Sequence, residues 1–266
     1  ARIDEKLRPQ FDYFRFIDDY TAYCDTEDEA QRFIRQLSDE LAKYKLLLNI
    51  KKTEIRALPQ ALTDEWIGAL ALRLPNSGEL SAYDAVNYLN LAVQVAKSSP
   101  DGSVLKYALK AITRHKLKFM AEFDVLRYAL TLSFHQTALL PLLGSLFDAT
   151  FFGTTFLYGD ELSRIALENA INRRSDGMAW TLYYLNKYDV TIDDDLAELI
   201  IASRDCVALL LLFQSGEAKH QAKVITFASG LDKDCLYDLD QYWILLYQLY
   251  IVDKIANPYA DEDAFE

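Results

Sequence analysis

Two adjacent carboxylates, Asp18 and Asp19, stand in the stretch FRFIDDYTAYCDT, between two segments whose residues favour β-strand. Adjacent carboxylates repel each other, and a tight hairpin turn more often uses Asn-Gly or Asp-Gly. The pair is therefore either an ordinary acidic turn or a group held in place to bind a cation. Mg²⁺ prefers carboxylate oxygens, and two-metal phosphoryl transfer needs carboxylates that hold two such ions about 4 Å apart.

The segments around the pair predict a hairpin followed by a helix. Residues 11–16 and 20–24 are rich in β-forming side chains and favour the two strands of the hairpin. Thr26 lies three residues before Glu29, which is the spacing of a capping box. Apolar residues then recur at helical spacing, so we expect a helix over 27–44 with one apolar face.

Short strands are expected next, at 46–48 and 53–58. The order of hairpin, helix and strand predicts an α+β half-domain in which the helix packs on a sheet. After Pro59 the pattern changes to helices joined by short polar turns. We therefore expect an α+β segment over 1–60 and a mainly α-helical, HEAT-like array after it.

The motifs of the first segment, taken in order over residues 8–58, closely resemble the palm of reverse transcriptases. They look like the bacterial branch that includes group II intron, retron and phage-defence enzymes. Phe16-Ile17-Asp18-Asp19 is similar to the aromatic-x-Asp-Asp motif of that family, and 46–53 is similar to its Leu-x-Leu-Asn-x-x-Lys-Thr motif. The long helical remainder is similar to the C-terminal region of abortive-infection and defence-associated members.

The resemblance implies an RNA-directed DNA polymerase, a nucleotidyltransferase that uses two Mg²⁺ ions and acts in antiviral defence. It implies a Mg²⁺ ligand at Asp18 and a weaker or supporting one at Asp19. Phe16 and Ile17 would lie near the primer end. Lys52 would lie near the phosphates of the incoming deoxynucleotide and could donate a proton to pyrophosphate. Nucleic acid and a deoxynucleoside triphosphate are the implied partners.

Three departures from the family pattern qualify this expectation. Phe16 replaces the commoner Tyr, and Lys45 stands where the family often has Gly, so the turn there is expected to differ. The family's other catalytic Asp precedes the Asp18-Asp19 motif, and only about fifteen residues of this chain lie there. We expect a piece of a longer polypeptide that does not polymerise by itself.

The helical part is expected to comprise a thumb-like region over 61–130 and a repeat-like domain over 131–266. Helices are expected at about 64–74, 103–120, 122–147, 160–173, 176–188, 194–203, 205–214, 217–229 and 238–254, with a further one opened by Ser81 and Asp84. Four cations recur at every fourth position of the helix over 103–120: Lys106, Lys110, Arg114 and Lys118. They form either a solvated helix face or a track for a phosphate backbone.

Charge divides along the same boundary. Residues 1–60 carry 11 basic and 12 acidic side chains, and the remainder carries 17 and 28. A strongly acidic region is a poor general binder of nucleic acid. The alternative function is therefore a non-catalytic helical scaffold, with a vestigial palm, for protein partners or self-assembly.

Three further patterns bear on location and on sites. The three cysteines are odd in number and lack zinc spacing, which favours a reducing cytoplasm, and no leader is seen at the first residue. The segment 137–158 has Asp148 as its only charge, but Pro and Gly interrupt it, so buried helices are favoured over a membrane span. The acidic run 193–195 is either a cation site or a helix cap, and the cap is favoured.

Overall fold

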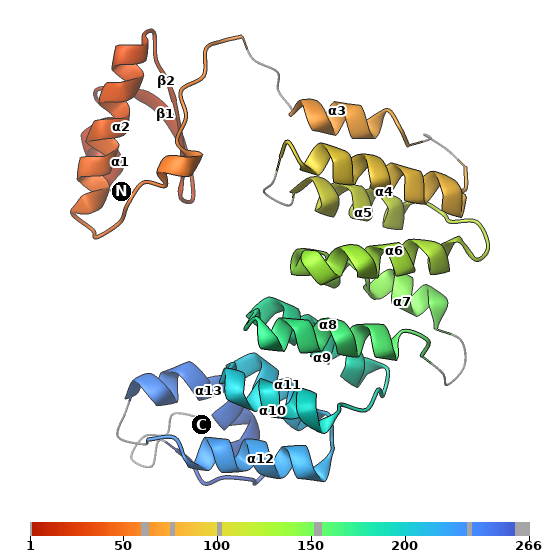
Figure 1. Cartoon of the computed structure of the whole chain (residues 1–266). Coiled ribbons are helices and arrows are strands. Elements are labelled where there is room, and N and C mark those ends of the chain that lie inside the picture. The colour runs from red at the N-terminus through yellow and green to blue at the C-terminus, as the bar shows by residue number, and fades with distance from the viewer. Residues whose placement is uncertain are drawn as a thin grey trace. The chain divides into compact units, whose positions relative to one another are not determined.

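The computed structural model divides the chain into two compact units, Ala1–Thr63 and Asp64–Glu266 (Figure 1). It describes residues 2–59, 64–74, 78–99, 103–151, 156–232 and 236–258. The division lies close to the boundary expected after residue 60. Each unit has a hydrophobic core of its own.

The first unit contains the hairpin and the helix that the sequence predicts. Its elements are α1 (Arg2–Leu7), β1 (Asp12–Phe16), β2 (Asp19–Tyr23), α2 (Glu27–Ala42) and the 3₁₀ turn η1 (Ile50–Lys52). β1 and β2 pair antiparallel, and α1 packs on α2. The small sheet is therefore supported by helices and does not stand alone.

The start of α2 confirms the capping box. The backbone N–H of Glu29 donates to Thr26 Oγ1 over 3.2 Å. In return the Glu29 carboxylate accepts from the N–H of Asp25 over 3.0 Å. Both bonds satisfy backbone donors that the first turn of a helix leaves without partners. This fixes the point at which the chain leaves β2 and enters α2.

The expected strands at 46–48 and 53–58 are wrong. Within the described part of the first unit, strands occur only at β1 and β2. Leu47 and Ile50 are 89% and 85% exposed. A strand needs a neighbouring edge for its backbone hydrogen bonds and a surface to bury its apolar side chains. This segment has neither, and only Leu48 packs on the core of the unit.

The second unit is a mainly helical array. Its helices are α3 (Glu65–Ala71), α4 (Ala82–Ala96), α5 (Ser103–Arg114), α6 (Ala121–His135), η2 (Thr137–Leu142), α7 (Gly144–Thr150), α8 (Gly159–Ile171), α9 (Ser175–Lys187), α10 (Asp194–Ser203), α11 (Cys206–Gln214), α12 (Ala218–Ser229) and α13 (Leu236–Ile251). Ser81 caps α4 by accepting from the N–H of Asp84. The expected border between residues 130 and 131 falls inside α6, and the division of the array stays a prediction.

The helices of the array lie in two rows that share one continuous core. In one row α4, α6, α8, α10 and α12 pack successively on one another, and in the other α5, η2, α9, α11 and α13 do so. Figure 1 shows α5 behind α4 and α9 behind α8. Each helix therefore buries the side that faces the other row and leaves the opposite side exposed. Whether the array is HEAT-like stays a prediction.

Several expected helices are shorter than the sequence indicates, and two of them differ most. The helix expected over 103–120 ends at Arg114, because the next residues pair with Leu80. The N–H of Leu80 donates to the carbonyl of Lys116 over 2.9 Å, and the N–H of Lys118 donates to that of Leu80 over 2.8 Å. The stretch 122–147 is three elements, since the backbone leaves helical geometry at Gln136.

No described helix has the length and apolar composition that crossing a membrane requires. The segment around Asp148 forms η2 and α7, and their apolar side chains belong to the array core. Cys24 and Cys206 are free thiols, and Cys235 lies outside the described residues.

Candidate active site

The turn that carries the two aspartates is a two-residue hairpin loop. Phe16 pairs with Asp19 in the strand register, so Ile17 and Asp18 are the loop residues. Of these two only Ile17 has a positive φ, 54°, which is the pattern of a type II′ turn. That position prefers Gly, and holding a β-branched residue there costs on the order of 1–3 kcal/mol. The hairpin keeps an unfavourable backbone conformation where it presents both carboxylates.

The two faces of the hairpin differ in what they contact. Tyr13 and Tyr20 point towards α2 and pack on the core of the first unit. Phe16 and Asp19 lie on the opposite, exposed face, where Phe16 is 75% exposed. Asp18 is exposed at the tip. The structure therefore exposes all four neighbouring residues that the sequence singled out, Phe16, Ile17, Asp18 and Asp19, at the tip of the hairpin.

Arg15 supports the turn from β1. Its Nε donates to the backbone carbonyl of Ile17 over 2.9 Å. Its guanidinium carbon lies 5.3 Å from the ring centroid of Tyr20, a cation–π distance. These contacts hold the peptide that precedes Asp18.

The carboxylates of Asp18 and Asp19 form no ion pair or side-chain hydrogen bond with any described residue. Neighbouring carboxylates without cations favour binding of an added cation. The described residues contain no group of three or more His, Cys, Asp or Glu placed to hold a metal ion. The hairpin supplies two carboxylates of a donor set, and not a complete one.

The chain after α2 makes a defined turn in which Lys45 takes the place of a glycine. Lys45 has φ 59°, in the left-handed region that helix C-termini usually fill with Gly. The N–H of Leu46 donates to the carbonyl of Leu41 over 3.1 Å, and the N–H of Lys45 donates to the carbonyl of Ala42 over 3.0 Å. These two bonds form a Schellman motif. Lys45 adopts the left-handed conformation that Gly supplies most readily at a helix C-terminus, and the expected difference from the turn of the family stays a prediction.

The segment 49–53 is held as a compact turn by Asn49. The side-chain oxygen of Asn49 accepts from the N–H of Lys51 over 3.1 Å. The backbone carbonyl of Asn49 accepts from Thr53 Oγ1 over 3.0 Å. Lys52 lies at the end of η1 with an exposed side chain. No described contact joins Lys52 to Asp18.

The basic stripe of the second unit is shorter than the sequence predicts. Lys106, Lys110 and Arg114 lie on the exposed side of α5, opposite its buried apolar residues. Lys118 is beyond the end of the helix, in the segment that pairs with Leu80. The expected four-residue stripe is therefore wrong in its last member.

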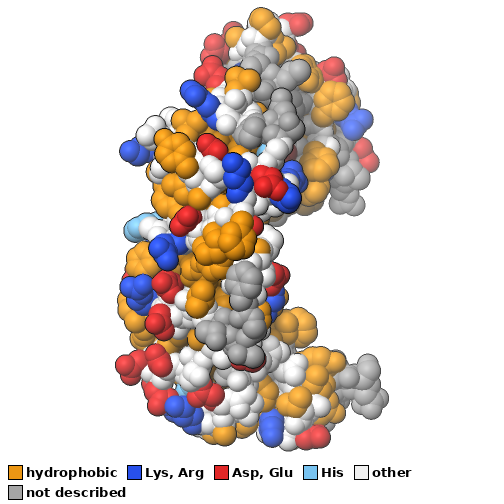
Figure 2. Space-filling view, turned by 90° about the vertical axis from the view of Figure 1, so that its right-hand side faces the viewer, with side chains coloured by type: hydrophobic (Ala, Val, Ile, Leu, Met, Phe, Trp, Pro, Cys, Tyr) orange, Lys and Arg blue, Asp and Glu red, His pale blue; other side chains and the backbone are white. Residues whose placement is uncertain are grey.

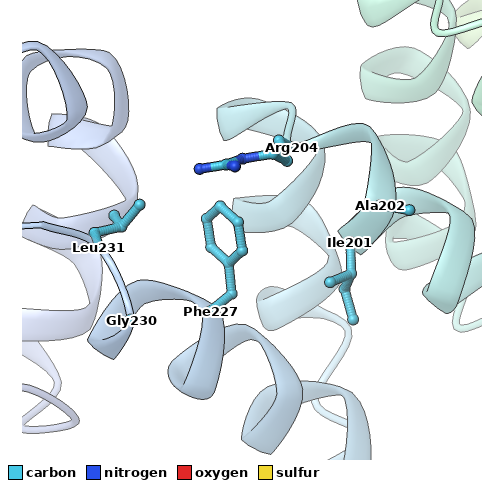
Figure 3. Close-up of a pocket in the computed structure, with 6 residues that line it drawn as sticks. All are labelled: Ile201, Ala202, Arg204, Phe227, Gly230 and Leu231. Atoms are coloured by element: carbon cyan, nitrogen blue, oxygen red, sulfur yellow. The ribbon is translucent and has the colours of Figure 1, made fainter.

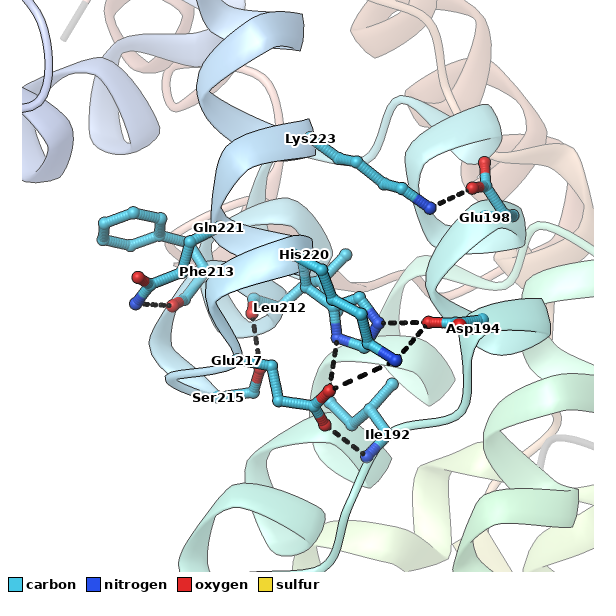
Figure 4. Close-up of polar contacts among 11 residues, drawn as sticks. Ile192, Asp194, Glu198, Leu212, Phe213, Ser215, Glu217, His220, Gln221 and Lys223 are labelled. Atoms are coloured by element: carbon cyan, nitrogen blue, oxygen red, sulfur yellow. Dashed lines mark hydrogen bonds and ion pairs between the residues drawn. The ribbon is translucent and has the colours of Figure 1, made fainter.

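A polar cluster between α10 and α12 was missed by the sequence analysis (Figure 4). His220 is fully buried, and its Nε2 lies 3.0 Å from Asp194 Oδ1. The ammonium of Lys219 lies 2.7 Å from the same oxygen, and it and His220 lower the pKa of Asp194 to about 2. The acidic run thus begins α10 as expected, and Asp194 also joins two helices.

A cavity of about 390 Å³ opens between the ends of α10 and α12 (Figure 3). Arg204, in the left-handed region with φ 58°, extends over the ring of Phe227 at 5.6 Å. The carbonyl of Arg204 accepts from the hydroxyl of Tyr242 over 2.9 Å, which ties this wall to α13. The cavity is lined by Ile201, Ala202, Arg204, Phe227, Gly230 and Leu231. No residue singled out by the sequence lies there.

The edge of the array that carries the connections α5–α6 and α7–α8 faces the viewer in Figure 2. Hydrophobic side chains gather near the middle of this view, and Lys, Arg, Asp and Glu are scattered around them. Among the coloured side chains of this view, neither sign of charge forms a single patch.

The chain matches no family model, no curated protein and no solved structure. The case for a function therefore depends on the residues and their geometry.

Proposed function

We propose that this chain is the C-terminal portion of an RNA-directed DNA polymerase that transfers nucleotides with two Mg²⁺ ions. The observation that carries the proposal is the hairpin turn, where Asp18 and Asp19 are exposed beside the strained Ile17 and have no cationic partner among the described residues. The chain over 45–53 also forms a defined turn, in which Lys45 has the left-handed conformation and Asn49 binds the backbone N–H of Lys51. A role in antiphage defence follows from the resemblance of the helical part to abortive-infection members.

The hairpin offers carboxylate oxygens, which are the ligands that Mg²⁺ prefers. Two carboxylates are too few for a complete site. Asp18 would be a direct ligand and Asp19 a supporting one, while the proposal requires a third carboxylate from elsewhere in the full-length polypeptide. A pair of Mg²⁺ ions held there supplies a lowered pKa for an attacking hydroxyl and charge neutralisation for the leaving phosphate.

The other residues of the site would position the turn, the primer end and the incoming nucleotide. Arg15 fixes the turn through the carbonyl of Ile17, which restrains the backbone from which the two carboxylates project. Phe16 offers an exposed ring beside Asp19, where a primer terminus could pack. Lys52 would place its ammonium near the phosphates of the incoming nucleotide and give a proton to departing pyrophosphate.

A non-catalytic scaffold is the second candidate, and the outer side of α13 favours it. Trp243, Tyr247 and Ile251 recur there at helical spacing and are exposed. The terminal units of repeat arrays usually present a polar outer face. An apolar one suits contact with a protein partner or a second copy.

The test of the proposal is nucleotide incorporation by the full-length polypeptide. Labelled deoxynucleotides are supplied with Mg²⁺ and with an RNA template, a DNA template or none. The polymerase proposal predicts acid-insoluble product that EDTA abolishes in at least one arm. Absence of product in all three arms, from protein whose folding circular dichroism verifies, contradicts it and favours the scaffold.

A further inference from the structure

The exposed side of α5 carries three cations. Lys106, Lys110 and Arg114 stand at intervals of four residues and are exposed, and none forms an ion pair with a described carboxylate. By contrast, the ammonium of Lys116 pairs with Glu79. Cations without acidic partners in a chain of net charge −12 indicate a local site for an anionic ligand.

The exposed side of α9 carries two aromatic rings. Trp180 and Tyr183 are 37% and 44% exposed, and their ring centroids lie 5.8 Å apart in an edge-to-face arrangement. The charged residues at the two ends of this side are already engaged. Asp176 accepts from the hydroxyl of Thr137, and Lys187 pairs with Asp148. The two rings are what remains here to contact a ligand.

η2 joins the cations to the rings. It packs against both α5 and α9, and its own exposed residues, Ala138 and Pro141, are small and uncharged. α4, α6 and α8 cover the other side of this row. The exposed sides of α5, η2 and α9 therefore form one surface, with cations and rings separated by about two interhelical spacings, roughly 16–20 Å.

We propose that this surface, the α5–η2–α9 face, binds single-stranded nucleic acid. Lys106, Lys110 and Arg114 hold the phosphates, and Trp180 and Tyr183 stack on the bases. Backbone cations combined with stacking rings are the features that single-strand binders use. An acidic peptide would satisfy the cations and leave the rings without a role. The inference goes beyond the proposed function and does not require catalysis.

The binding is measured with the 266-residue chain and a fluorescently labelled oligothymidylate by anisotropy, without Mg²⁺ or nucleotides. Failure here leaves the polymerase proposal standing, and failure of incorporation leaves this one standing. The double variant Lys106→Gln/Lys110→Gln is expected to reduce the slope of log affinity against log salt by about 1.4. Arg127→Gln/Arg164→Gln, which removes equal charge from exposed positions in the other row, should leave affinity within about twofold.

The rings are tested separately from the charges. Trp180→Ala and Tyr183→Ala are expected to weaken binding about fivefold or more each, with the salt slope unchanged. Trp243→Ala, at an exposed tryptophan of α13, is the matched control. In the variant Trp66→Phe/Trp243→Phe, where Trp180 is the only tryptophan, the oligonucleotide should quench the fluorescence.

Two results would overturn the proposal. One is that the oligothymidylate does not bind, or binds the control double variant as weakly as the α5 double variant. The other is that polyglutamate binds as tightly as the oligothymidylate and neither ring substitution matters. That second result would assign the surface to an acidic protein partner.

Discussion

Arg15 donates from Nε to the backbone carbonyl of Ile17 over 2.9 Å. This bond closes the hairpin loop from the β1 side, while the guanidinium packs on Tyr20. Because Asp18 and Asp19 directly follow Ile17, the placement of both carboxylates depends on that contact. The turn that exposes both carboxylates is therefore held by Arg15, which is itself part of β1.

The strain at Ile17 gives a first prediction. Replacing Ile17 with Gly removes a β-branched residue from φ 54°, so the hairpin should become more stable by about 1 kcal/mol. Hydrogen exchange of the β1 and β2 amides measures this. Ile17→Val keeps the strain and should change the protection little. Equal protection in the two variants would show that the turn is not strained.

A second prediction concerns the end of α2. Lys45→Gly places the preferred residue at φ 59° and should raise the free energy of unfolding by about 0.5–1 kcal/mol in urea titrations. Lys43→Gly is the matched control, since Lys43 has φ −61° and Gly there should destabilise by a similar amount. If both variants shift the midpoint in the same direction, the Schellman turn is wrongly assigned.

A third prediction tests the packing of α9 on α8. A Cβ at Gly177 would collide with the carboxamide of the buried Asn169, so Gly177→Ala should cost about 1–3 kcal/mol. At Gly68 in α3 an added Cβ meets no heavy atom within 4 Å, and Gly68→Ala should stabilise by about 0.5–1 kcal/mol. Thermal unfolding of the two variants should move in opposite directions.

A fourth prediction follows from the ion pair between α10 and α12. Lys219, and then His220, lower the pKa of Asp194 from 3.8 to about 2. A carboxyl whose pKa is lower in the folded than in the unfolded protein stabilises the fold at pH values above its unfolded pKa. That stabilisation is lost as pH falls from about 4 towards 2. Acid unfolding of Asp194→Asn should therefore lack this part of the pH dependence. An identical acid profile for the two proteins contradicts the assignment.

Signals confined to neighbouring residues were enough to predict part of this structure. The caps at Thr26 and Ser81 depend on residues three positions apart, and both helices begin as expected. The hairpin was predicted because its strands are adjacent in sequence and need no distant partner. The position of Asp18 and Asp19 at its tip was predicted on the same basis.

Features that depend on distant contacts or on backbone angles were not predicted. The end of α5 is set by Leu80, far from Arg114 in the sequence. Asp194 and His220 meet only because α10 packs on α12. Nothing in the residue types of Ile17 and Lys45 reveals a positive φ. The apolar residues at 46–58 have the composition of strands, yet no sheet edge within the described residues pairs with them.

The central claim is that Asp18 and Asp19 form the metal-binding part of a nucleotidyl-transfer site. The most direct test is the rate of Mg²⁺-dependent nucleotide incorporation by the full-length polypeptide carrying Asp18→Asn. We predict a loss of at least about 100-fold, a smaller loss for Asp19→Asn, and no loss for Asp39→Asn, an exposed carboxylate on α2. Incorporation at the unsubstituted rate by Asp18→Asn would contradict the claim.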